Sequence, residues 1–215
     1  MARCACLLAV LLAFAVEARS LEVGALEAPA SYRYRIHHQI FGDIGEHRMT
    51  VRREAGAIVV EHTAELAVEI LGLTAFHRST RLREVWRDGY LLAFDGLIED
   101  DGEPFPVTAR AEGDHLIIEG RAGRIEASAG TAPSEPSLER AIRRDWFFDM
   151  KTGRLLRATV TPAGREPVKV GDTVVDAARY EITGDLEQHV WFDRTGAWVQ
   201  WRLWRQGAAI TLVRE

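Results

Sequence analysis

Histidine side chains are the residues of this chain best suited to metal binding or proton transfer, and the chain has seven of them. Alternation of apolar and polar residues places His38, His47 and His62 on the apolar faces of three consecutive expected strands. If these strands pair as hairpins, the three imidazoles lie close together, and imidazoles grouped in this way bind zinc. No two of them have a spacing diagnostic of a zinc site, and no carboxylate shares their faces. We therefore favour partly buried, hydrogen-bonded histidines and assign no metal.

Two charged residues, Arg78 and Glu84, fall on an apolar face of a further expected strand, beside Phe76, Leu82 and Trp86. A charge on a buried face is costly unless it is paired or reaches water. One interpretation makes Arg78 and Glu84 the polar anchors of a mostly apolar cavity, which is the usual composition of a small-molecule site. The alternative is a structural ion pair, or a face that is open to solvent.

Catalytic motifs are absent from the sequence. It has no Gly-x-Ser-x-Gly, no His-Glu-x-x-His and no phosphate-binding loop. Carboxylates are abundant, but Asp88 and the run Glu99-Asp100-Asp101 occupy expected turns, where solvated charge is the norm. A hydrolase is therefore the least favoured of our functional interpretations, and we assign neither catalytic residues nor a cofactor.

The first 18 residues are typical of a secretory signal peptide. A short basic start at Met1–Arg3 precedes an apolar run over Cys4–Val16, and Val16-Glu17-Ala18 has small residues at the two positions that a signal peptidase reads. The run is too short to span a bilayer, which needs roughly 20 residues, and no later apolar run is longer. We expect a periplasmic or secreted bacterial protein that is not an integral membrane protein once the signal is removed.

Composition narrows the function further. Both cysteines lie inside the signal peptide, so a processed chain would have no disulfide, no thiolate nucleophile and no cysteine-ligated zinc. The formal net charge of −5 argues against a nucleic-acid partner, because nucleic acid requires a basic surface. Lysine occurs only at positions 151 and 169, so nearly all positive charge is arginine.

The elements that must position these residues are nearly all strands. After a lead-in over residues 19–31, a single β domain is expected over 32–215, with about fourteen short strands at regular spacing. The alternating run 58–70 exceeds the usual strand length and predicts strong curvature or a bulge. The one expected helix follows a Gly- and Pro-containing loop and covers residues 137–143, with Ser137 as a weak N-cap. The fold class is all-β: a strongly curved, chiefly antiparallel sheet forming a half-barrel.

The C-terminal stretch 179–214 is the most aromatic part of the chain. It holds four of the six tryptophans, Trp191, Trp198, Trp201 and Trp204. Alternation predicts Trp198 and Trp204 on one face of the sheet and Trp201 on the other, with Val199 and Leu203.

Several motifs in order resemble a secreted bacterial family, domain of unknown function 6134. They are Tyr34 with Gly42-x-x-Gly45-x-His47-Arg48, Glu84-x-Trp86-x-Asp88-Gly89, and Gly184-x-Leu186 leading to Trp191-Phe192-Asp193 and Gly196. The family has no established activity. The last hairpins also resemble, more weakly, periplasmic lipoprotein carriers, in which a half-barrel holds acyl chains on its concave face. That second resemblance implies the handling of a lipid or another hydrophobic ligand.

Two functional hypotheses remain besides a hydrolase. The first is a curved half-barrel that binds an apolar or lipid-like ligand on an inner wall of Ile36, Leu66, Val68, Phe76, Trp86 and Trp191, with Arg78 and Glu84 as polar anchors. The second is a structural or interaction module of the cell envelope that docks a partner protein through its aromatic C-terminal sheet.

Overall fold

The computed structural model describes residues 29–205 and 207–215. The expected signal peptide, and the lead-in up to residue 28, lie outside the described residues. The first half of the chain forms β1 (Ala30–His38), β2 (Gly42–Glu54), β3 (Ala57–Ile70), β4 (Leu73–Arg87), β5 (Tyr90–Asp100), β6 (Glu103–Glu112), β7 (His115–Gly120) and β8 (Gly123–Ser128). The second half forms β9 (Ala132–Pro133), α1 (Glu139–Ile142), β10 (Trp146–Phe148), β11 (Leu155–Val170), β12 (Thr173–Gly184), β13 (Gln188–Phe192), β14 (Trp198–Arg205) and β15 (Ala208–Arg214).

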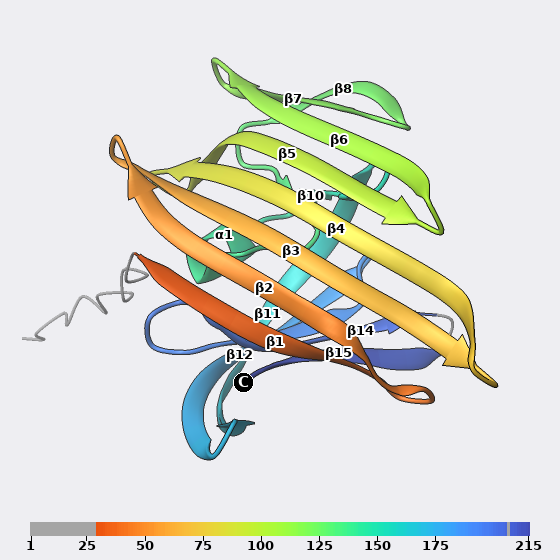
Figure 1. Ribbon diagram of the computed structural model, residues 1–215. Coiled ribbons are helices and arrows are strands. Elements are labelled where there is room, and N and C mark those ends of the chain that lie inside the picture. Colours follow the sequence, from red (N-terminus) through yellow and green to blue (C-terminus); the bar gives the residue numbers. More distant parts are fainter. Residues whose placement is uncertain (1–28, 206) are drawn as a thin grey trace, which may run out of the picture.

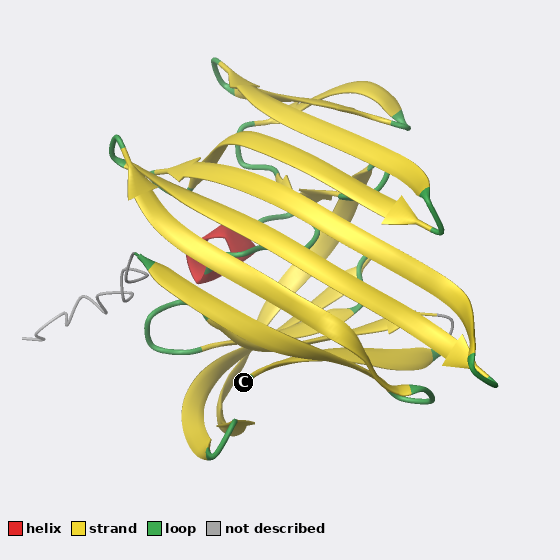
Figure 2. Cartoon of the chain, viewed as in Figure 1, coloured by secondary structure: helices red, strands yellow, loops and turns green. Residues whose placement is uncertain are grey.

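All fifteen strands of the described chain belong to one sheet, in the order β8-β7-β6-β5-β4-β3-β2-β1-β15-β14-β13-β12-β11-β10-β9. Every pair is antiparallel except β9 and β10. The first and last strands pair in the middle of the sheet, with Ile36 opposite Leu212. The sheet is therefore two sequential meanders joined by β1 and β15, and it curls without closing into a barrel (Figures 1 and 2). The predicted fold class, an all-β, strongly curved and chiefly antiparallel sheet, is confirmed.

The segment 129–154, which we call the plug, runs through the space enclosed by the curled sheet. It carries β9, α1 and β10, and Figure 1 shows α1 between the two walls. Its apolar side chains are buried in one core with those of both walls: Leu138, Ala141, Ile142, Phe147, Phe148 and Met150. Its Thr152–Gly153 turn lies against Gly120, where a Cβ would stand 2.7 Å from the Thr152 carbonyl oxygen. Side chains of the chain itself thus fill most of the concave space.

Strand bounds follow the alternating pattern closely, with three differences. The strand β1 begins at Ala30, inside the expected lead-in. The long strands β11 and β12 are each continuous where the sequence predicts two separate strands, and β11 passes through Pro162 with a register shift before Arg165. The helix α1 is shorter than predicted, and Leu138 rather than Ser137 is its N-cap, with no side-chain capping bond.

The predicted faces of the C-terminal tryptophans were wrong for Trp201 and for Trp204, which lies on the outer face beside His189. A bulge in β14 places Phe192 opposite Trp198 but Trp191 opposite Gln200, so that Val199 is the extra residue. The bulge turns Trp201 to the inner face, where its ring stacks on Trp198 with a centroid separation of 5.7 Å. One inserted residue reverses the face of every residue that follows.

A second, smaller core lies on the outer face of the sheet. The far end of the β11–β12 hairpin packs there against β13 and β14, through Val168, Val170, Ala177, Trp191 and Val199. The indole of Trp191 is buried and donates a hydrogen bond of 2.6 Å from Nε1 to Glu166. The predicted inner wall required Trp191 and Trp86 to share a face, and in the structure they lie on opposite faces.

Candidate functional site

The inner face of the sheet, which the sequence predicts as the ligand surface, is largely covered by the plug. Several hydrogen bonds hold the plug to the sheet, and three of those with a length of 2.7 Å end on backbone carbonyls. The Gln188 amide donates to the Ser134 carbonyl, the Trp198 indole to the Pro136 carbonyl, and Arg144 to the Gly89 carbonyl. Any ligand on this face must occupy the space that the plug leaves, or displace the plug.

A buried hydrogen-bonded chain connects the plug to β2 and β3. His47 Nε2 lies 2.9 Å from His62 Nδ1, and His62 Nε2 lies 2.9 Å from the hydroxyl of Ser137 in the plug. A neutral imidazole has one donor and one acceptor nitrogen, so His62 donates on one side and accepts on the other. Burial lowers the pKa of His47 to about 4 and that of His62 well below its usual 6.5. Both rings are therefore neutral at neutral pH.

The carboxyl group of Glu84 adjoins this chain. Its Oε2 accepts a 2.7 Å hydrogen bond from Trp86 Nε1, and its Oε1 lies 3.7 Å from His62 Nε2. Burial raises the pKa of Glu84 to about 7, although the nearby Ser137 hydroxyl and the Trp86 indole oppose the rise. The structure thus brings Glu84 and Trp86 together as a buried polar pair, with no path for a ligand between them.

A serine hydroxyl bonded to an imidazole is the arrangement of a nucleophile and its general base. Here the second nitrogen of His62 contacts another histidine instead of a carboxylate, and Ser137, His62 and Glu84 are all buried. A substrate cannot reach Ser137 while the plug is in place. The arrangement can fix the plug, and it does not form an accessible catalytic site.

Of the three predicted neighbours, His38 is the one that stays apart. It is half-exposed at the end of β1, where its Nδ1 accepts a hydrogen bond from the Ile40 amide. Within residues 29–205 and 207–215, no group of three or more His, Cys, Asp or Glu side chains is arranged to hold a metal ion.

An open polar cavity of about 320 Å³ lies at one end of the inner face. Arg78 lines it from β4, and Lys151 lines it from the plug. Arg78 donates two hydrogen bonds of 2.5 and 2.7 Å to the Asp100 carboxylate, and Lys151 donates one of 2.5 Å to the same group. Two cations share this one carboxylate, and the cavity is also lined by Arg154, Asp149 and Asp185. Arg205 also lines the cavity and makes no ion pair with any described residue. Arg78 therefore lines an open cavity, and its ion-pair partner is Asp100 and not Glu84.

A carboxyl group from the plug, Glu135, also lines this cavity. Desolvation raises its pKa to about 7, against the opposing charges of Arg78 and Arg205. At neutral pH Glu135 is thus only partly ionised, which leaves the cations of the cavity less neutralised than a count of charged residues suggests.

Beyond the cavity the inner face of the β3–β4 hairpin is apolar and only partly covered. Phe76 is half-buried beside Arg78, whose guanidinium lies 5.6 Å from the ring centroid. Val68 pairs with Phe76, and Leu66 pairs with Arg78, and both aliphatic side chains are partly buried against the core. The structure thus joins Phe76 and Arg78 at the open end, while Glu84, Trp86 and Ile36 are enclosed in the core.

The model of the family named domain of unknown function (DUF6134) matches residues 41–215. The chain belongs to the DUF6134 family. The match covers the candidate cavity and the buried histidine chain of this DUF6134 domain. No curated protein matches the chain.

A solved structure shares the fold of this DUF6134 chain. It is the crystal structure of a beta-barrel-like protein of domain of unknown function DUF1849 from Brucella abortus, with a TM-score of 0.62 and 11% sequence identity. The alignment covers 90% of this chain and 97% of that one. At this identity the likeness concerns the fold alone.

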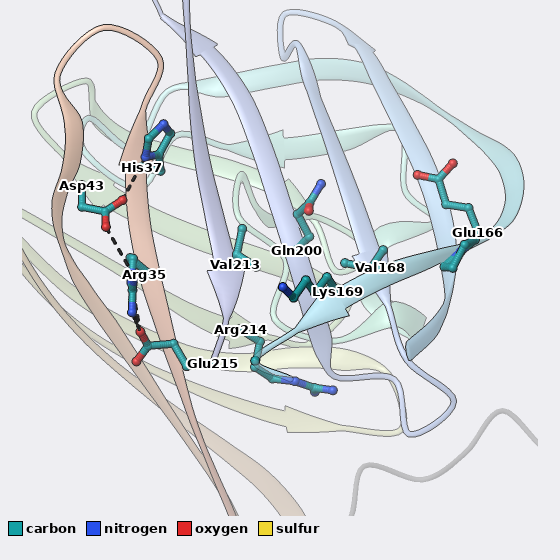
Figure 3. Close-up of a pocket in the computed structure, with 12 residues that line it drawn as sticks. Arg35, His37, Asp43, Glu166, Val168, Lys169, Gln200, Val213, Arg214 and Glu215 are labelled. Atoms are coloured by element: carbon teal, nitrogen blue, oxygen red, sulfur yellow. Dashed lines mark hydrogen bonds and ion pairs between the residues drawn. The ribbon is translucent and has the colours of Figure 1, made fainter. Parts of the chain in front are cut away.

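A larger groove, of about 610 Å³, opens on the outer face between β1 and the β11–β12 hairpin (Figure 3). Several charges at its edge neutralise one another: Arg35 pairs with Glu215 and Asp43, and His37 lies 2.9 Å from Asp43. Val168 and Val213 line it, and Lys169 points into it (Figure 3). Sequence reasoning did not single out this groove, because its residues come from four distant segments.

Several residues of the inner sites were not predicted from the sequence, among them Ser137, Asp100 and Lys151. Ser137 was interpreted as a helix cap, and its real partner, His62, is 75 positions away. Asp100 was assigned to a solvated turn, and Lys151 had no signal except that lysine is rare in this chain. Counting outward from the Asp88-Gly89 turn gives the register of β4 against β5, and it would place Arg78 within one residue of Asp100. A bulge in β5 accounts for that one-residue shift.

Proposed function

We propose that this protein binds an acyl-like ligand with an anionic head group at the open end of its inner face. The observation that carries the proposal is the cavity in which Arg78, Lys151 and Arg205 adjoin the half-covered apolar surface of Phe76 and Val68. Apolar walls with a few convergent polar groups are typical of small-molecule sites. The head group would meet the cations, and the chain would lie along the apolar wall.

Several cations of this cavity can meet an anion. Four cationic side chains line it, against three carboxylates, and Asp100 pairs with two of the cations: the lining charges are Arg78, Lys151, Arg154, Arg205, Glu135, Asp149 and Asp185. A carboxylate or phosphate would complete these charge-assisted hydrogen bonds, which are stronger than neutral ones. Glu135 has a pKa of about 7, so at neutral pH it carries less negative charge than an ordinary glutamate would.

We also propose a location in the periplasm or outside the cell, because residues 1–18 are typical of a signal peptide. Among the described residues, no helix is both long enough and apolar enough to cross a membrane.

The alternative function, an envelope module that docks a protein through its aromatic C-terminal sheet, has less support. Trp191, Trp198 and Trp201 are all buried, and only Trp204 of that stretch is partly exposed. The structure therefore offers no broad aromatic surface there for a partner.

A titration with fluorescent fatty acids tests the proposal on protein recovered from the periplasm of a bacterial host and freed of lipid. The matched variants are Arg78→Gln and Arg81→Gln, because Arg81 lies on the same strand but faces solvent. We expect Arg78→Gln to weaken binding about tenfold and Arg81→Gln to leave it unchanged. A fatty alcohol of equal length should bind less tightly than the acid. Equal affinity of both arginine variants, or no binding by the wild type, would refute the proposed site.

A further inference from the structure

Exposed aliphatic side chains are concentrated at two neighbouring hairpin tips. Of the eight large hydrophobic side chains exposed in the described part of the chain, five lie there: Ile40, Phe41, Ile70, Leu71 and Leu73. The turns β1–β2 and β3–β4 lie at the same end of the meander (Figure 1). We call these five residues the apolar rim. Exposed apolar side chains grouped in this way mark an interaction surface.

The tip residue Leu71 has no role in folding that accounts for its type. Its backbone has a φ of 53°, a left-handed conformation that a bulky side chain rarely adopts, and its side chain is 99% exposed. Asp88-Gly89 and Asp101-Gly102 form turns of the same kind, with φ values of 51° at each aspartate. Aspartate suits that position better than leucine. The chain therefore accepts local strain at one tip in order to present an aliphatic side chain.

The rim continues the inner face beyond the plug. Ile70 pairs with Leu73 across the hairpin. The register shift beside Val68 puts the extra residue, Ala75, in β4, so alternation along β3 still places Ile70 on the inner side. Outward from Val68 and Phe76, the exposure of the apolar side chains rises to 74% at Leu73. The rim therefore consists of two neighbouring hairpin tips at one end of the sheet.

We propose that the apolar rim inserts into the surface of a lipid bilayer. Five side chains with about 100 Å² of apolar surface each provide roughly 500 Å², whereas each partner in a stable protein complex contributes about 800 Å². A bilayer has no minimum contact area and no shape to match, and the apolar ends of Leu and Phe side chains anchor well at its interface. This inference goes beyond ligand binding and does not require the cavity to hold a ligand.

Vesicle flotation tests the inference with protein recovered from the periplasm of a bacterial host. The vesicles are phosphatidylcholine alone and phosphatidylcholine mixed with phosphatidylglycerol. We expect the wild type to float with both, because the rim contains no charged side chain. Leu71→Asp recreates the sequence of the two Asp-Gly turns, so it preserves the fold, and we expect it to lower vesicle binding at least tenfold, as should Leu73→Ser.

Val174→Asp is the matched control, because Val174 is 69% exposed but lies on β12, away from the rim. It should float like the wild type. The inference is overturned if the wild type stays unbound with both vesicle types, or if Leu71→Asp floats as well as the wild type. Cross-linking of position 71 to a soluble protein, without vesicle binding, would also overturn it.

Two variants separate this inference from the proposed ligand site. Leu71→Asp should bind a fatty acid normally in vesicle-free solution, whereas Arg78→Gln should float normally but bind fatty acid weakly. Either proposal can therefore fail while the other stands.

Discussion

His47 Nε2 and His62 Nδ1 lie 2.9 Å apart in a site closed to solvent, with the indole of Trp198 5.7 Å from both rings. The contact needs one nitrogen as donor and the other as acceptor, so the two imidazoles cannot both be protonated, and burial favours the neutral form of each ring. Nearby, burial raises the pKa of Glu84, so that its carboxyl group favours the protonated, uncharged form. The centre of the protein thus favours uncharged forms of three titratable groups.

The variant Glu84→Gln should become more stable relative to the wild type as the pH rises. The pKa of Glu84 is raised to about 7 in the folded protein, from a usual value of 4.5. The stabilisation from its protonated form is complete below pH 4.5 and is lost as the pH rises to about 7. This pKa shift corresponds to a change of roughly 3 kcal/mol in the free energy of unfolding. Urea unfolding of both proteins at pH 4.5 and pH 8 measures it, and a constant difference in stability would contradict the burial of Glu84.

The variant His47→Gln should show the reverse dependence. The folded pKa of His47 is lowered to about 4, so the wild type loses stability as the pH falls from 6.5 towards 4. Glutamine keeps a hydrogen-bonding group but cannot be protonated. The unfolding free energy of the variant minus that of the wild type should therefore be about 2 kcal/mol larger at pH 5 than at pH 7.5. The two shifts oppose each other, so difference curves of unfolding free energy reveal them where a single wild-type curve would not.

Removing the hydroxyl of Ser137 should loosen the plug. In Ser137→Ala the buried His62 Nε2 loses its hydrogen-bond partner, which costs about 1–2 kcal/mol. Amide hydrogen exchange should accelerate in residues 129–154 more than in β1–β4. Ser134→Ala is the control, because this buried serine of the plug makes no side-chain hydrogen bond to described residues. Equal exchange in both variants would show that Ser137 does not hold the plug.

Truncating Trp191 should destabilise the outer core without affecting the ligand site. Trp191→Ala removes a large side chain from the cluster of Val168, Val170, Ala177 and Val199, and the expected loss is about 3 kcal/mol. Fatty-acid affinity should stay within about twofold of the wild type, because no Trp191 atom lines the inner cavity. Phe76→Ala should instead weaken binding with a smaller loss of stability, since Phe76 is half-buried. Reversed results would restore Trp191 to the predicted inner wall.

Aspartate at position 71 should also raise stability. Leucine at a φ of 53° is strained, and the change to the residue found in the two related turns should stabilise the fold by about 0.5–1 kcal/mol. The shift in the urea midpoint of Leu71→Asp measures this gain. A loss of stability would mean that Leu71 contributes a packing contact that its exposure does not reveal.

Alternation of residue types was enough to predict the sheet, but bulges limited the prediction of the face on which each side chain lies. The faces of His47, His62, Glu84 and Trp86 were predicted correctly because no bulge intervenes in the parts of β2, β3 and β4 that hold them. The bulge at Val199 reversed Trp201, and nothing in the local sequence marks it. Periodicity reports local geometry, so it fails wherever one inserted residue changes the phase.

The plug was the main feature that sequence reasoning missed. Its Gly-, Pro- and Ser-containing sequence is typical of a surface loop, yet Ser137, Leu138 and Phe148 are almost completely buried. Its burial depends on partners on distant strands, such as His62 and Gln188. The cavity at Arg78 is defined by the end of this segment, so its shape could not be predicted before the plug was seen. The family was recognisable, because its motifs lie in the strands and turns that the pattern does predict.

The pairing of β1 with β15 has a consequence for how the chain tolerates truncation. Protein ends usually survive trimming, because few contacts depend on them. Here β15 pairs with both β1 and β14 at the middle of the sheet, so its seven residues make the strand pairing that links the two meanders. A stop codon just before residue 208 would divide the sheet at its centre, and proteolytic clipping at this end would be as damaging as a cut through a core strand.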